Sequence, residues 1–112
     1  MTLPSFPDGP AHTASDRAAW IKAAGGLSAA LDADRLSTPV TMPLVEALVL
    51  GLMRQGVTKY LAIFGHGSTA LADVLDAYEA EGLVRCWQFR NEVEMAHAGT
   101  ALSWVYGEVG AV

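Results

Sequence analysis

The sequence predicts an α/β protein with an open parallel sheet and helices on both faces. Two short runs, at 60–64 and 83–89, are expected to form strands. The first is uninterrupted and apolar between turn signals, which is typical of a strand buried on both faces. Segments with helical spacing alternate with these runs, giving the order helix, strand, helix, strand, helix, strand. The last strand opens at 109–112, where the sequence ends, so we expect a sheet truncated after its third strand.

The composition excludes two broad classes of protein. The chain has 112 residues, of which 52% are hydrophobic and 17% are charged, too apolar and too weakly charged for a disordered segment. Seven Lys and Arg against twelve Asp and Glu give a net charge of −5 without a basic cluster, which argues against nucleic-acid binding. Because a small domain has a large surface relative to its volume, so apolar a chain is expected to bury apolar surface against a partner.

Cysteine usage and hydropathy bear on the compartment. Cys86 is the only cysteine, so neither an intramolecular disulfide nor a multi-cysteine metal site can form. The first residues lack the charged start and apolar core of a signal peptide. The most apolar run, Leu44 to Met53, falls well short of the roughly 20 residues that span a bilayer, and it contains Glu46. We therefore expect a buried helix there and a cytoplasmic protein without a membrane segment.

Residues 1–40 are interpreted as an N-terminal arm and helix. Prolines and a lack of periodicity over 1–14 predict an arm that is either mobile or strapped to the domain. Ser15 is expected to cap a helix that runs to about Ala24. A pair of glycines then interrupts it, and a short helix is expected over 27–37.

The next helix opens residues 41–112. Pro43 suits a first helical position, where its missing N–H costs nothing, and Gly56 is a natural stop. The expected inward stripe has four-residue spacing and consists of Leu44, Val45, Leu48, Val49, Leu52 and Met53.

The first strand leads through a tight loop, Gly65-His66-Gly67, into a helix that Ser68 or Thr69 caps and Gly82 ends. Its expected inner face consists of Leu71, Val74, Leu75 and Tyr78.

After the second strand, Asn91 is expected to cap a third helix that ends at Gly107, with Glu94 in the capping-box position. This helix is rich in small residues that allow close approach of another element: Ala96, Ala98, Gly99 and Ala101.

Ligands of such sheets collect at the carboxyl ends of the strands, which points to the loops 65–69 and 90–92. The first loop leaves backbone N–H groups free at a helix start, which suits an anion or a closely packed ligand, but it is neither GxGxxG nor a Walker loop. Glycines that serve only the turn are the alternative interpretation. His66 between them is expected to be exposed, either inert or useful through titration near neutral pH.

The second loop is richer in candidate chemistry. Glu92 is expected at the first helical position, where the helix dipole favours an anion, and it has no structural task comparable to that of Glu94. His97 lies among small apolar residues and is interpreted as a hydrogen-bonded packing residue. No Ser-His-Asp set, HExxH motif or metal-ligand cluster can be assembled, so no metal site is expected.

Two motifs occur in order and in the expected structural context: Ile63-Phe64-Gly65-His66-Gly67, then Phe89-Arg90-Asn91-Glu92 followed by Ala96-His97-Ala98. Together they resemble the N-terminal pyrimidine-binding domain of thiamine-diphosphate-dependent enzymes, above all the acetolactate synthase-like group. The Phe-Gly-His-Gly version is similar to the trihydroxycyclohexanedione hydrolase of inositol breakdown. The resemblance covers about residues 41–112 and implies that they form a partial pyrimidine-binding domain. Residues 1–40 have no counterpart in this resemblance.

The resemblance implies roles for these residues. In that family the glutamate after the second strand, here Glu92, hydrogen-bonds N1′ of the aminopyrimidine and so promotes removal of the thiazolium C2 proton. The family's first active-site loop, here Gly65-His66-Gly67, faces the thiazolium and the substrate, with His66 as the expected polar contact or proton shuttle. The implied reaction is a lyase or transferase step that cleaves or joins a carbon–carbon bond of a 2-oxo acid or diketone.

The family also has parts that this sequence lacks. Its domain continues past the third strand with a Gly-Pro-Gly turn, whereas this sequence ends at Val112. The diphosphate and Mg²⁺ site, with a Gly-Asp-Gly…Asn motif, belongs to a separate domain, and the cofactor lies between domains of two chains. The resemblance therefore implies a fragment or split subunit that acts only with a chain carrying the diphosphate-binding domain, in a homo- or hetero-oligomer.

Two other interpretations stay open. One is a non-catalytic assembly module, or inactive fragment, that keeps the fold and its dimer surface without the chemistry. The other is a small flavodoxin-like nucleotide binder, which rests on fold analogy alone.

Overall fold

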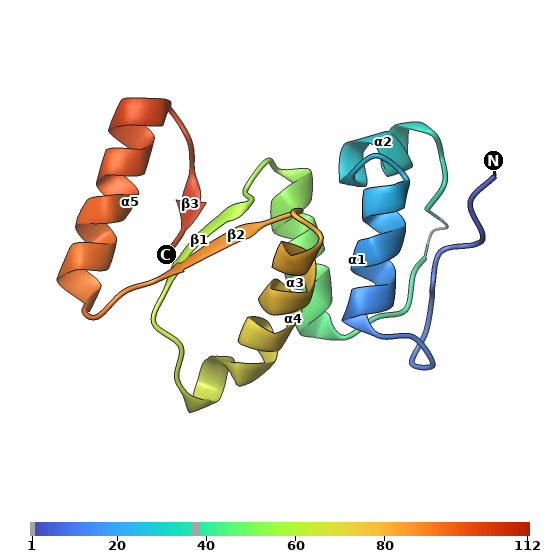
Figure 1. Ribbon diagram of the computed structural model, residues 1–112, viewed down its shortest axis with the longest axis horizontal. Helices are drawn as coiled ribbons and strands as arrows, with labels where there is room; N and C mark the ends of the chain where they lie inside the picture. The colour runs from blue at the N-terminus through green and yellow to red at the C-terminus, as the bar shows by residue number, and fades with distance from the viewer. Residues whose placement is uncertain (1, 37–38) are drawn as a thin grey trace.

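The computed structural model describes residues 2–36 and 39–112 and shows an α/β chain with a small open parallel sheet (Figure 1). Because its strands pair in parallel, the α/β class and the parallel arrangement predicted from the sequence are confirmed. The elements in chain order are α1 (Ala14–Ala23), α2 (Leu27–Asp32), α3 (Leu44–Arg54), β1 (Lys59–Ala62), the short 3₁₀ helix η1 (His66–Ser68), α4 (Thr69–Ala80), β2 (Arg85–Gln88), α5 (Glu92–Tyr106) and β3 (Gly110–Ala111).

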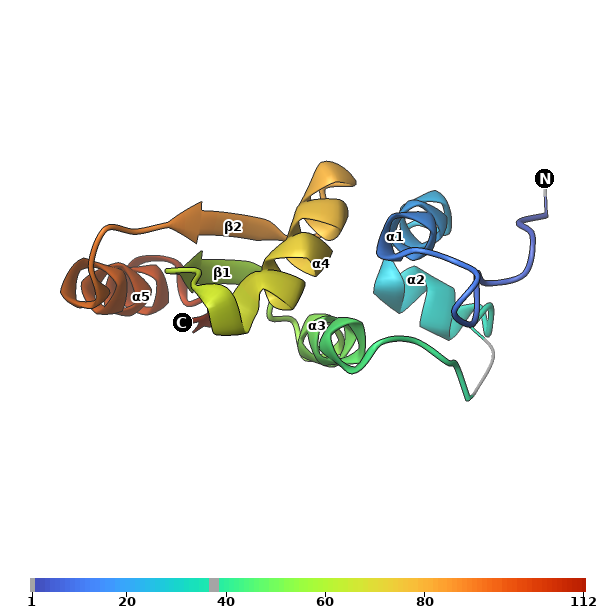
Figure 2. The same ribbon diagram turned by 90° about the horizontal axis from the view of Figure 1, so that it is seen from below.

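The strand order is β2-β1-β3, so β1 lies in the middle of the sheet. The connection through α4 moves from β1 to one side, and the connection through α5 returns across β1 to the other side. Because such connections are right-handed, opposite directions place α4 and α5 on opposite faces. Figures 1 and 2 show this arrangement, with α5 on one side of the strands and α3 and α4 on the other.

The cap predicted for the first helix was wrong by two residues, since Thr13 rather than Ser15 caps α1. The Thr13 hydroxyl accepts a hydrogen bond from the Asp16 backbone N–H at 3.2 Å, and the Asp16 carboxylate accepts one from the Thr13 N–H at 2.8 Å. This reciprocal capping box satisfies two free donors at once. The same hydrogen bonds hold the pKa of Asp16 below its usual value.

The helix predicted over 27–37 is shorter than expected. It ends at Asp32, and position 37 lies outside the described residues. The two glycines before it have positive φ angles of 97° and 104°, which explains why they end α1. Pro43 occupies the N-cap of α3 rather than its first helical position.

The inward stripe predicted for α3 was partly wrong. Leu44 and Leu48 are 86% and 54% exposed, whereas Glu46 is fully buried beside Val49. The helix is therefore turned so that a carboxylate, rather than two leucines, faces its neighbours. A buried carboxylate is tolerated only with partners that compensate for its lost hydration.

Those partners come from the two helices packed nearby, and they form what we call the Arg17–Glu46–Tyr78 cluster. The Arg17 guanidinium of α1 donates from Nε to Glu46 Oε1 and from Nη2 to Oε2, both at 2.7 Å. The Tyr78 hydroxyl of α4 donates to Oε1, also at 2.7 Å. The hydrogen bond to Glu46 raises the pKa of Arg17, while burial and then that carboxylate raise the pKa of Tyr78. Three helices thus meet at one satisfied polar cluster.

The N-terminal arm is strapped down, which settles the alternative left open by the sequence for the described residues. Trp20 of α1 donates from its indole nitrogen to the Pro4 carbonyl at 2.8 Å. Its ring also packs edge-on against the ring of Phe6, with 5.3 Å between the two ring centroids. Arg17 fastens the rest of the arm, because its Nη1 lies 3.1 to 3.3 Å from three backbone carbonyls, those of Pro7, Gly9 and His12.

The hydrophobic core lies between the first two helices and α3 with α4, and residues from both sides of position 40 share it. Ala18 and Ile21 of α1 are fully buried, and so is Tyr78 of α4. The described residues before position 41 therefore pack against the following α/β unit.

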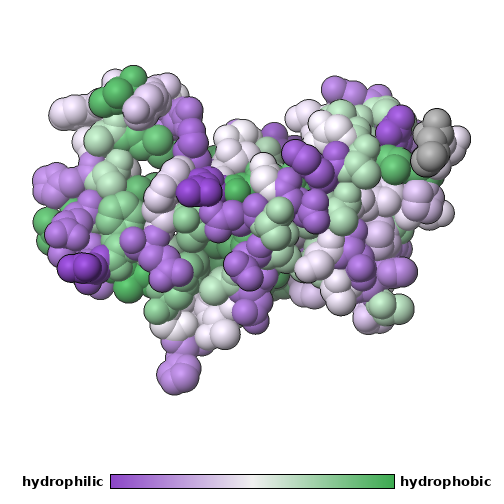
Figure 3. Space-filling view, in the orientation of Figure 1, coloured by the Kyte–Doolittle hydropathy of each residue, from purple (hydrophilic) through white to green (hydrophobic). Residues whose placement is uncertain are grey.

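Helix α5 contrasts with this core because none of its residues is buried. Val93, Trp104, Val105 and Tyr106 are between 67% and 85% exposed, and Figure 3 shows hydrophobic residues on the surface at this end of the molecule. None of the helices in the described ranges has both the length and the apolar character needed to cross a membrane.

Candidate functional site

The carboxyl ends of β1 and β2 lie side by side. The Phe89 N–H, just after β2, donates to the Ala62 carbonyl at the end of β1, with 3.1 Å between nitrogen and oxygen. The loop after β1 leads to α4, whereas the loop after β2 leads to α5 on the opposite face. Two adjacent loops that diverge in this way form a topological switch point, the usual binding edge of open α/β sheets.

The loop after β1 is held by its own hydrogen bonds. The Gly65 N–H donates to the Ser68 hydroxyl at 2.9 Å, and the Ser68 N–H donates to the Gly65 carbonyl at 3.0 Å. Ser68 occupies the N-cap of α4, one of the two predicted positions, but its hydroxyl serves the loop rather than the helix N–H groups. The loop is therefore organised without any ligand.

Neither glycine of the loop is required by the backbone or by packing. Gly65 and Gly67 are absent from the positive-φ glycines of the described residues. A Cβ placed on either would meet no described atom within 4 Å. The turn therefore does not explain these glycines, and the open space above them would allow a ligand to approach the backbone closely.

The loop after β2 leads into a well-capped helix. The Asn91 side chain accepts a hydrogen bond from the Glu94 backbone N–H at 2.9 Å, as predicted. The returning bond expected from the Glu94 carboxylate does not form in the described structure, which leaves both early carboxylates of α5 exposed. Since successive residues turn by about 100°, Glu92 and Glu94 point to different sides of the helix.

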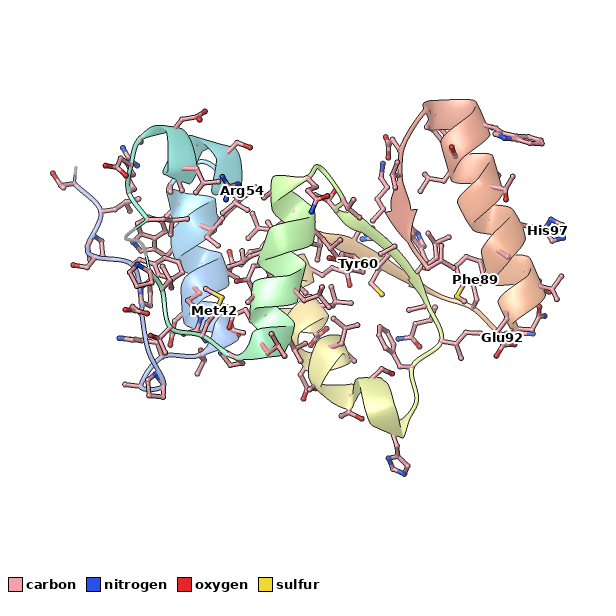
Figure 4. The ribbon with its side chains drawn as sticks, turned by 180° about the vertical axis from the view of Figure 1, so that it is seen from behind. Met42, Arg54, Tyr60, Phe89, Glu92 and His97 are labelled. Atoms are coloured by element: carbon pink, nitrogen blue, oxygen red, sulfur yellow. The ribbon has the colours of Figure 1, made fainter. Side chains whose placement is uncertain are left out.

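Glu92 is the first residue of α5, and Figure 4 shows it close to Phe89, where β2 gives way to the helix. Its carboxylate is exposed and has no hydrogen-bond or ion-pair partner among residues 2–36 and 39–112. The positive end of the helix dipole stabilises its charge. A free carboxylate at the switch point can accept a proton and, once protonated, donate it to a ring nitrogen, which is the chemistry that the resemblance implies for this residue.

The two histidines differ from each other in position. His66 is exposed at the start of η1, as predicted, in the loop that adjoins the end of β2. The packing role predicted for His97 is wrong, because its side chain is exposed and Figure 4 shows it pointing away from the rest of the chain. The reason is that α5 faces the sheet with another side, leaving its Ala96-His97 side uncovered.

One buried group and one half-buried group beneath this edge were missed from the sequence. Tyr60 and Cys86 are register partners in β1 and β2, and the Tyr60 hydroxyl has no hydrogen-bond partner in the described part of the chain. Burial, and then Cys86, raises the pKa of Tyr60, while burial and then Glu79 raise the pKa of the Cys86 thiol. A raised pKa lowers the fraction of the reactive thiolate, so Cys86 carries no part in the candidate chemistry. Tyr60 lies within a continuous apolar run and Cys86 within a predicted strand, and neither pattern is a signal for chemistry.

A cavity of about 270 Å³ lies between α4 and β2 next to the same edge. Its lining residues include Phe64, which directly precedes the first candidate loop, and Gln88, the last residue of β2. Over the described ranges, no group of three or more His, Cys, Asp or Glu side chains is arranged to hold a metal ion.

Comparison of the chain with protein-family models, with curated proteins and with solved structures finds no match in any of the three. The functional assignment therefore rests on the two loop motifs and on where the fold places them.

Proposed function

We propose that this chain is the pyrimidine-binding part, or split subunit, of a thiamine-diphosphate-dependent enzyme of the acetolactate synthase-like kind. It would act on 2-oxo acids or diketones, cleaving or joining a carbon–carbon bond. The observation that carries the proposal is the free Glu92 carboxylate, which starts α5 directly after Phe89-Arg90-Asn91 at the switch point of the sheet. The family resemblance of both loop motifs supports it.

The residues of this chain have distinct tasks in the proposal. Thiamine diphosphate, when bound, supplies a carbon nucleophile at thiazolium C2. Glu92 holds and returns a proton at N1′ of the aminopyrimidine, and the α5 N-terminus stabilises its carboxylate whenever the proton has left. Gly65 and Gly67 leave room for close approach to the loop backbone, and His66 provides a polar contact for the substrate.

A partner chain completes this proposal. The exposed apolar side chains of α5 suit burial against a second polypeptide, because so many large apolar groups on one helix are seldom left in water. We assign the diphosphate and Mg²⁺ site to a partner chain with the diphosphate-binding domain, in a cytoplasmic homo- or hetero-oligomer. The same exposed helix also favours the second candidate, an assembly module without chemistry.

Calorimetric titration of thiamine diphosphate distinguishes the two candidates. The chain is co-expressed with its diphosphate-binding partner and titrated in the presence of Mg²⁺. An enzyme subunit is expected to give saturable binding and turnover of a 2-oxo acid, whereas an assembly module would give neither although the complex forms. Failure of the intact complex to bind the cofactor would therefore overturn the catalytic proposal in favour of the module.

A further inference from the structure

An apolar groove lies at the other end of the molecule, away from the candidate site. It has a volume of about 300 Å³ and lies between α2, α3 and three described residues of the connection between them, Leu36, Val40 and Met42. One face of α3 forms its floor through residues at helical spacing: Ala47, Leu50, Gly51 and Arg54. Its walls are apolar and include Leu27 and Leu31 of α2, with Val40 and Met42 from the connecting segment.

Small residues keep this groove open. Gly51 lies in the middle of α3, where glycine costs about 0.5–1 kcal/mol relative to alanine, and its φ does not require glycine. A Cβ placed on Gly51 would meet no described atom within 4 Å. Neither the helix nor the packing therefore accounts for this glycine, whereas an occupant of the groove would.

A single cation marks one end of the groove. Arg54 ends α3, and Figure 4 shows its side chain beside α2, with Met42 nearer the opposite end of the helix. Among residues 2–36 and 39–112, no carboxylate forms an ion pair with Arg54. The guanidinium is thus available to a carboxylate whose apolar tail lies along α3.

We propose that this groove binds a monocarboxylate with an unbranched alkyl chain of about six to eight carbons, its head on Arg54 and its tail toward Met42. At about 30 Å³ for each non-hydrogen atom, 300 Å³ accommodates about ten such atoms, the number in octanoate. Residues 47 to 54 span about 10 Å of helix, which matches an extended chain of this length. The proposal is independent of the thiamine-diphosphate assignment.

Calorimetry on the 112-residue chain with butanoate, hexanoate, octanoate and octanol tests the proposal. Saturable binding to one site is expected, tightening by up to about fourfold for each added methylene. Arg54→Gln is expected to weaken the binding of octanoate by about three- to fivefold and to leave the binding of octanol unchanged. Lys22→Gln, which removes an exposed charge from α1, is the matched control and should change neither.

Gly51→Leu places a large side chain in the free space of the groove, so both octanoate and octanol are expected to lose binding. Because leucine has a higher helix propensity than glycine, the variant is also expected to melt at a higher temperature. Absence of saturable octanoate binding to the parent chain would overturn the proposal. Unchanged octanoate affinity in Arg54→Gln would also overturn it, because the charge would then have no role. Retained binding in Gly51→Leu would overturn it as well, because the ligand would then bind elsewhere.

Discussion

Replacing Arg17 by methionine tests whether the Arg17–Glu46–Tyr78 cluster holds the helices and the arm together. Methionine keeps an unbranched side chain of similar reach but removes every donor. The Glu46 carboxylate would then keep only the hydrogen bond from Tyr78, and three backbone carbonyls of the arm would lose their donor. An uncompensated charge would remain in the interior.

The expected cost follows from the burial of the pair. Arg17 is 1% exposed and Glu46 is 0% exposed, so solvent screens neither charge. Removing one partner from such a pair costs about 3–5 kcal/mol, a large part of the roughly 5–15 kcal/mol that stabilises a small domain. The double change Arg17→Met with Glu46→Leu removes the stranded charge, so it is expected to be more stable than Arg17→Met alone, by about 2 kcal/mol.

Urea unfolding followed by circular dichroism and tryptophan fluorescence measures both effects. Trp20 is the useful fluorophore because it is buried against the arm, whereas Trp104 is 85% exposed. A loss of less than about 1 kcal/mol in Arg17→Met, the range of an exposed ion pair, would refute the reasoning. A double variant less stable than Arg17→Met would refute it as well.

Three further predictions concern the tyrosines and one glycine. Tyr78→Phe removes the hydrogen bond to Glu46 and is expected to lower the free energy of unfolding by about 1.5–3 kcal/mol. Tyr60→Phe removes a buried hydroxyl without a partner in the described structure and should raise that free energy by about 1 kcal/mol. Urea unfolding measures both, and a change in the same direction for the two variants would contradict this prediction. Because folding raises the pKa of both hydroxyls, the native state keeps protons that the unfolded chain loses above about pH 10, so stability should fall as pH rises through that value. Thermal melting from neutral to alkaline pH checks this, and the fall should be smaller in Tyr78→Phe; an equally steep fall would contradict it. Gly110→Ala should cost about 1–3 kcal/mol in the same unfolding assay, since its Cβ would lie 2.9 Å from Leu61 Cδ1 and 3.0 Å from Leu102 Cδ2, and unchanged stability would show that this packing can relax.

The sheet could be predicted from the sequence because buried parallel strands leave a local signal. The run at 60–64 is apolar throughout and overlaps β1, and the strand predicted at 83–89 contains β2. The cap at Asn91 and the stop at Gly107, which has a φ of 66°, were equally local and were confirmed. The same local signals placed Glu92 at a helix start beside a strand end.

The parts that failed depend on distant partners. Glu46 is buried because Arg17, 29 positions earlier, reaches it, and no periodicity within α3 contains that information. The same packing turned Leu44 and Leu48 outward. His97 was expected to pack because its neighbours are small, but the side of α5 on which it lies has no cover in the described structure.

Exchange of the C2 proton of thiamine diphosphate, followed by NMR in the assembled complex, tests most directly whether Glu92 activates the cofactor. Glu92→Gln keeps the size of the side chain and removes its capacity to hold a proton. Glu94→Gln removes the same charge from the same helix turn and serves as the control. We expect Glu92→Gln to slow the exchange by about 10²–10⁴-fold while Glu94→Gln leaves it unchanged. Equal exchange rates in the two variants and the parent complex would contradict the proposed role of Glu92.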